Sequence, residues 1–83
     1  MQIVFSPKAA KEFARLPKEL QRRLAKKLQT YTDSPRPLAF AKAMAGDHTG
    51  SYRYRIGDYR VIFDYTVTQI SIYRIGHRKD VYQ

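Results

Sequence analysis

The sequence contains no cysteine, which excludes disulfide bonds and thiolate metal sites. It has no long apolar run either. The N-terminal stretch MQIVFSPKAAKEF cannot form a signal peptide or a membrane span, so we expect a soluble, cytoplasmic protein. Acidic residues are scarce, 7 against 16 lysines and arginines, and the net charge is +9. A polyanion is therefore the expected partner, and nucleic acid, an acidic membrane surface and an acidic protein all satisfy this bias.

The composition predicts one small folded domain over residues 1–83. Hydrophobic residues make up 43% of the chain, including seven tyrosines and four phenylalanines. This is enough apolar surface for one sheet packed on one or two helices, whereas 83 residues are too few for a second core.

The first 31 residues predict a strand followed by two helices. Residues 2–5 are β-branched or aromatic, and Ser6 and Pro7 then provide an N-cap and a first helical residue. Pro17 interrupts the helical pattern, so the first helix should end at Leu16. The second helix buries a stripe of apolar residues and exposes a basic face. The stripe is Leu20, Leu24, Leu28 and Tyr31, and the basic face is Arg22, Arg23, Lys26 and Lys27.

After a loop, in which residues 38–44 are expected to form a short helical turn, the period of the sequence changes to two. Two strands flank Gly57-Asp58, where glycine in first place favours a type II′ turn. The run 70–75 has large side chains at both parities, so we expect a third strand inside the sheet and covered on both faces. The predicted fold is α+β: an N-terminal strand, an αα-hairpin and a three-stranded antiparallel meander forming one small sheet packed on the helices, in the order β-α-α-β-β-β.

The hairpin turn fixes which side chains share a face. Arg55 should pair with Arg60, and Arg53 should lie on the same side. The opposite face collects the core residues Tyr52, Tyr54, Ile56, Tyr59, Val61 and Phe63. Opposed like charges destabilise a hairpin by up to about 1 kcal/mol, so we expect an anion at the arginine face. The alternative is a solvated face on which the arginines lie apart from one another.

The C-terminal residues add a second set of polar side chains. His77 and Arg78 follow the third strand of the meander, and Tyr82 lies four residues beyond Arg78. Histidine exchanges protons near neutral pH, which suits a phosphate substrate. The alternative is that His77 caps the strand and Tyr82 packs on the sheet.

The sequence resembles the RelE-type toxins of the RelE/ParE superfamily in three features. These are the order of elements, the segment from Gly46 to Gly50 that leads into the hairpin, and the motifs YRYRIGDYRVIFDY and IGHRKDVY. The resemblance implies the toxin of a type II toxin–antitoxin system. It implies a ribosome-dependent endoribonuclease that needs no metal or other cofactor, cleaves mRNA by attack of the 2′-hydroxyl and inhibits translation. The implied partners are a cognate antitoxin, mRNA and the ribosome, with no membrane.

The resemblance also implies roles for individual residues. Cations for the charge that builds on phosphorus come from Arg53, Arg55, Arg60 and Arg78. His77 is the candidate for proton transfer, and Tyr82 is expected to position the scissile nucleotide. Some family members have lysine where this chain has arginine, which is a poor base because it stays protonated. The base is therefore left open between His77, Asp58 and Asp80.

Several other functions compete with this one. A ParE-like toxin has a similar fold but poisons DNA gyrase, and the tail pattern argues against it. A non-catalytic RNA-binding module needs exposed rings, whereas most tyrosines here are expected to face the core. Membrane binding would need an apolar stripe that the sheet already covers. His48 and His77 with scattered aspartates do not make a metal ligand set. The basic helix face is expected to contact either the antitoxin or ribosomal RNA.

Overall fold

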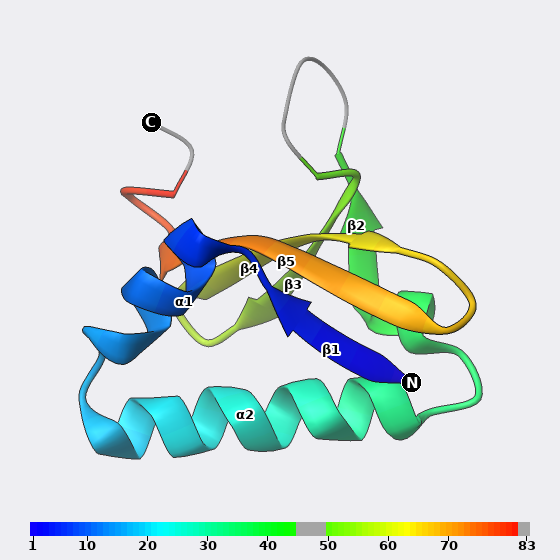
Figure 1. The fold of residues 1–83 in the computed structure, drawn as a ribbon, viewed down its shortest axis with the longest axis horizontal. Coiled ribbons are helices and arrows are strands. Elements are labelled where there is room, and N and C mark those ends of the chain that lie inside the picture. The colour runs from blue at the N-terminus through cyan, green and yellow to red at the C-terminus, as the bar shows by residue number, and fades with distance from the viewer. Residues whose placement is uncertain (45–49, 82–83) are drawn as a thin grey trace.

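The computed structural model describes residues 1–44 and 50–81 and confirms the α+β class (Figure 1). Tyr82 and His48 lie outside the described residues. The elements in chain order are β1 (Gln2–Phe5), α1 (Pro7–Ala14), α2 (Lys18–Asp33), a 3₁₀ turn η1 (Pro37–Phe40), β2 (Ala41–Ala43), β3 (Tyr52–Ile56), β4 (Tyr59–Tyr65) and β5 (Gln69–His77). Figure 1 shows α2 running alongside one side of the sheet.

The described strands form one sheet in the order β1-β5-β4-β3-β2. The antiparallel meander of β3, β4 and β5 is confirmed, and β1 joins it as a parallel strand on β5. The expectation of a helical turn over residues 38–44 is only partly correct. Residues 37–40 form the 3₁₀ turn, but residues 41–43 are an edge strand on β3. The short run Ala-Lys-Ala has no apolar alternation of its own, so the open edge of β3 decides its conformation.

The first helix begins as the sequence predicts. The Ser6 hydroxyl accepts a hydrogen bond from the Ala9 N–H at 3.0 Å, which caps α1, and Pro7 is the first helical residue. Helix α1 ends at Ala14, two residues before the predicted end. The Leu16 N–H already bonds to the Phe13 carbonyl, which tightens the chain into the turn before α2.

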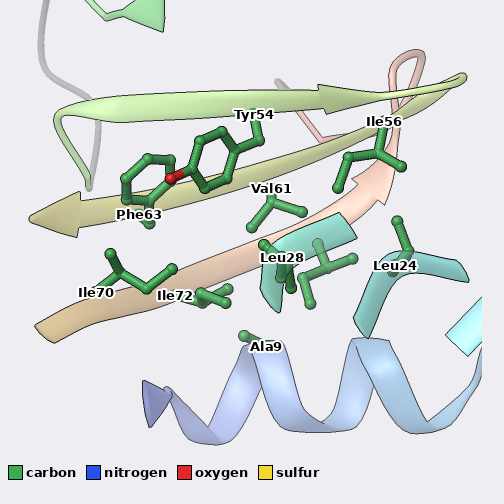
Figure 2. Close-up of a cluster of buried hydrophobic side chains, with 10 residues drawn as sticks. Ala9, Leu24, Leu28, Tyr54, Ile56, Val61, Phe63, Ile70 and Ile72 are labelled. Atoms are coloured by element: carbon green, nitrogen blue, oxygen red, sulfur yellow. The ribbon is translucent and has the colours of Figure 1, made fainter. Parts of the chain in front are cut away.

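The core lies between the sheet and the two helices (Figure 2). Leu24 and Leu28 of α2 are fully buried, as the apolar stripe predicts, and they pack with residues of all three strands of the meander. The rings of Tyr54 and Phe63 stack at 4.4 Å within this cluster. The Tyr54 hydroxyl donates to the Pro37 carbonyl at 3.0 Å, and burial raises the pKa of Tyr54 to about 12.

A β-bulge explains the mixed parity of β5. Arg74 pairs with Ile62, but Ile72 pairs with Phe63, so Tyr73 is an extra residue on β5. The bulge reverses the alternation, and the isoleucines on either side of it, Ile70, Ile72 and Ile75, are all buried in the core. Strand β5 lies inside the sheet as expected. The large side chains at both parities follow from the bulge, which brings Ile75 to the same face as Ile70 and Ile72.

Candidate RNA-binding site

The predicted register of the hairpin is confirmed. Arg55 pairs with Arg60 and Arg53 with Ile62, while Gly57 has a φ of 61°. Within residues 1–44 and 50–81, positive φ occurs only at glycines, so Asp58 has the negative φ that a type II′ turn requires. The arginines therefore share the face of the sheet that points away from the helices, which we call the arginine face.

The three arginines of this face differ in exposure. Arg55 is exposed and Arg53 is half-buried, but Arg60 is only 6% exposed. The Arg60 Nη1 donates to the carbonyls of Gly57 and Tyr59 at 3.1 and 3.0 Å. Arg60 thus braces the hairpin turn. Because these hydrogen bonds stabilise the Arg60 guanidinium, the pairing of Arg55 with Arg60 does not by itself require a bound anion.

The tail folds back over the end of the sheet. Val81 is 3% exposed and packs over Gly76, where an added Cβ would lie 3.5 Å from the Val81 Cβ. The Arg78 N–H donates to the Asp58 carbonyl at 2.8 Å, and the Arg78 Nε lies 4.0 Å from Asp58 Oδ1. Both side chains are more than half exposed, so this ion pair is weak. The Arg78 side chain is therefore exposed beside the Gly57-Asp58 turn, which follows the strand that carries Arg55.

A carboxylate from α1 also holds the tail. Glu12 Oε1 accepts the Ile75 N–H at 2.9 Å, and Glu12 Oε2 pairs with Arg74 Nη2 at 3.1 Å. The Arg74 Nη1 then reaches the Val81 carbonyl at 3.4 Å. Sequence reasoning missed this connection, since Glu12 and Arg74 are 62 residues apart and neither belongs to a recognisable motif.

His77 does not share the arginine face. It pairs with Tyr59 across β4 and β5, and the two rings meet edge to face at 5.7 Å. Tyr59 packs against the core, so His77 lies on the helix side at the end of β5. Its Nδ1 accepts the Lys79 N–H at 3.2 Å, which leaves Nε2 as the protonated nitrogen of the neutral ring. His77 is adjacent to Arg78 at the end of β5, where the Arg78 backbone bonds to Asp58 of the hairpin turn.

The four basic residues of α2 are all exposed, as predicted: Arg22, Arg23, Lys26 and Lys27. Arg23 also reaches the hairpin turn, since a Cβ on Gly57 would lie 3.0 Å from the Arg23 Nη2. This contact joins the basic surface of α2 to the turn beside which Arg78 stands.

Neither a metal cluster nor a membrane helix is found in the described part of the chain. No group of three or more histidine, aspartate or glutamate side chains gathers in residues 1–44 and 50–81. No helix within these ranges is both long and apolar enough to cross a bilayer.

Residues 3–82 match the family model described as the ParE toxin of the type II toxin–antitoxin system parDE. The chain belongs to this toxin family. The match confirms the superfamily that the sequence motifs predicted. No curated protein matches the toxin in a sequence search.

Solved structures share the fold of the toxin. The archaeal RelE–RelB complex from Pyrococcus horikoshii contains a chain that is 26% identical, with 96% of this chain and 97% of that chain covered at a TM-score of 0.70. A chain of the RelBE2 toxin–antitoxin complex from Mycobacterium tuberculosis is 22% identical, with 93% of this chain and 96% of that chain covered at a TM-score of 0.74. A chain of the YoeB dimer from Staphylococcus aureus is 17% identical, with 93% of this chain and 95% of that chain covered at a TM-score of 0.70.

Proposed function

We propose that this toxin is a metal-independent endoribonuclease that cleaves mRNA at the ribosome and thereby inhibits translation. One observation carries the proposal: two exposed cations, Arg55 and Arg78, flank the hairpin turn at the same end of the sheet at which His77 ends β5. A phosphate at this end of the sheet has arginines to bind it and an imidazole to exchange a proton.

The chemistry assigns different roles to these groups. The 2′-hydroxyl of a nucleotide attacks the adjacent phosphate, and negative charge builds on the phosphoryl oxygens. Arg55 and Arg78 neutralise this charge, with Arg53 on the same face, because guanidinium groups stay protonated and bind phosphate through two N–H groups. Arg60 supports them by holding the turn carbonyls.

Proton transfer is assigned to His77, whose Nε2 carries the proton of the neutral ring. As the imidazolium, His77 donates the Nε2 proton to the leaving oxygen and returns to the neutral ring. As the neutral ring, it accepts a proton from the attacking hydroxyl at the nitrogen that carries none. Asp58 is held near Arg78 and is the second candidate for a base. Tyr82 is retained as the residue that positions the scissile nucleotide.

A cognate antitoxin is the proposed protein partner. Solved relatives are found in complexes of RelE with RelB. An extended acidic segment would suit the basic surface of α2 and the neighbouring turn. Charge reversal at Lys26 and Lys27 should weaken antitoxin binding or ribosome binding, and a variant that leaves both unchanged would remove this assignment.

A second candidate function is inhibition of DNA gyrase without cleavage of RNA. The family match favours it, because the matching model describes ParE toxins. In that case the arginine face and Arg78 would bind a target and perform no chemistry.

The test compares the wild type with His77→Ala and Arg78→Ala, induced in bacteria without antitoxin. Lys79→Ala is the matched control, since Lys79 is an exposed neighbour whose bond to His77 uses only its backbone. Ends of mRNA fragments are mapped on translated and untranslated copies of one transcript. Cuts confined to the translated copy and lost in both site variants support the proposal. Toxicity without cuts supports the gyrase function.

A further inference from the structure

The bulge in β5 turns one tyrosine toward the arginine face. Five other tyrosines belong to the core or pack against it: Tyr31, Tyr52, Tyr54, Tyr59 and Tyr65. Tyr73 instead lies beside Ile62, since a Cβ on Gly50 would contact both side chains. Ile62 alternates with the core residues Val61 and Phe63 and therefore lies on the arginine face. Hydrogen bonding with the Asp64 carboxylate raises the pKa of the Tyr73 hydroxyl. Strand alternation in the sequence does not predict this orientation of Tyr73, because Tyr73 is the extra residue of the bulge.

The ring of Tyr73 lies against Gly50, which comes close to its edge. A Cβ on Gly50 would lie 3.3 Å from Tyr73 Cδ2 and 2.6 Å from Ile62 Cγ2. The ring therefore lies beside Ile62, and the residue remains partly exposed.

The arginines are at a fixed spacing from this ring. Arg74, the next residue, pairs with Ile62, and Ile62 pairs with Arg53 on the far side of β4. Two inter-strand steps separate the backbone at the bulge from that of Arg53, about 10 Å. Arg55 lies two residues further along β3, about 7 Å closer to the turn. The face thus offers a partly exposed ring followed by a row of cations.

We propose that Tyr73 is a stacking platform for one base of a single-stranded RNA, whose phosphates run over Arg53 and Arg55 toward Arg78. The inference rests on the proposed RNA cleavage for its biological meaning. An aromatic face accepts any base, and cations nearby hold the backbone, which is the combination that single-stranded RNA needs. An acidic peptide would use the arginines but gain little from the ring.

The chain has no tryptophan, so Tyr73→Trp introduces a single indole whose fluorescence reports stacking. Tyr65→Trp is the matched control on the helix side of the sheet. The probe is a short 2′-O-methyl oligoadenylate, which lacks the attacking hydroxyl and binds without being cut. We expect quenching of the indole at position 73 and none at position 65. An abasic strand of equal length and polyglutamate should leave both unquenched.

Affinity measurements separate stacking from structural support. Tyr73→Leu should weaken binding of the oligoadenylate by about tenfold or more, whereas Tyr73→Phe keeps the ring and should stay within about threefold of wild type. Equal losses in both variants would show that the hydroxyl bond to Asp64 matters and the ring does not, and would overturn the inference. If Tyr73→Leu does not fold, the quenching of the indole in Tyr73→Trp tests the inference by itself.

The two proposals fail in different ways. Quenching by the oligoadenylate without cuts in cellular mRNA would sustain the stacking site and remove the nuclease. Cuts in cellular mRNA with no quenching, or with equal quenching by the abasic strand or polyglutamate, would sustain the nuclease and remove the stacking site.

Discussion

Glu12 of α1 accepts a backbone hydrogen bond from the part of β5 that lies beyond the end of β1. Strand β1 ends at Phe5, opposite Ile72, so among residues 1–44 and 50–81 no strand pairs with the following stretch of β5 on that side. The carboxylate of Glu12 accepts the Ile75 N–H at 2.9 Å and pairs with Arg74 at 3.1 Å. Replacing Glu12 by alanine should therefore weaken the end of β5 together with the tail that Arg74 holds.

The magnitude follows from these contacts. A hydrogen bond to a charged group contributes about 1.5–3 kcal/mol, and a partly exposed ion pair adds up to about 1 kcal/mol. The two side chains are 21% and 24% exposed, so screening by solvent is incomplete. We expect Glu12→Ala to lower the free energy of unfolding by about 2–3 kcal/mol, and Arg74→Ala by about 1 kcal/mol, since it leaves the bond to Ile75 intact. A loss of about 2 kcal/mol lowers Tm by roughly 8–16 °C in a domain of this size.

The assay is urea and thermal unfolding followed by circular dichroism. Lys11→Ala, an exposed change on the same helix, is the control and should stay within about 0.5 kcal/mol of wild type. Glu12→Gln retains an acceptor for Ile75 and should fall between wild type and Glu12→Ala. If Glu12→Ala costs no more than Arg74→Ala, the carboxylate does not support the strand edge and the reasoning is refuted.

Three further changes test the fold. Gly50→Ala should destabilise by about 1–3 kcal/mol, because its φ is 98° and the new Cβ would approach Ile62 to 2.6 Å; unchanged urea midpoints would contradict this. Tyr54→Phe removes the bond to Pro37 and should cost about 1–2 kcal/mol. Because the pKa of Tyr54 is raised to about 12, wild type should lose stability as pH rises from 10 toward 12, and the phenylalanine variant should lose less in an alkaline titration. Ser6→Ala should cost about 1 kcal/mol in thermal unfolding, whereas Ser6→Asp should retain most of the cap.

Local patterns in the sequence were sufficient for much of the fold. The cap at Ser6, the apolar stripe of Leu24 and Leu28 and the register around Gly57 each depend on neighbouring residues and on one period or turn type. The motifs likewise indicated the toxin family that the match over residues 3–82 confirms.

The candidate site was predictable only in part. The sequence placed Arg53, Arg55 and Arg60 on one face, and the register confirms it. It did not show that Arg60 is buried on the turn carbonyls, or that His77 meets Tyr59 on the other side of the sheet. Alternation along a strand gives a face, but a long side chain such as arginine can fold back onto nearby backbone.

The sequence by itself determined the α+β order, the hairpin register and the basic character of the exposed surfaces, because each is set by residues close together in the chain. Tertiary structure alone decided the bulge that exposes Tyr73, the strand formed by residues 41–43 and the contact between Glu12 and β5. These features arise where segments distant in the sequence compete for the same backbone hydrogen bonds, so the pattern of neighbouring residues does not predict them.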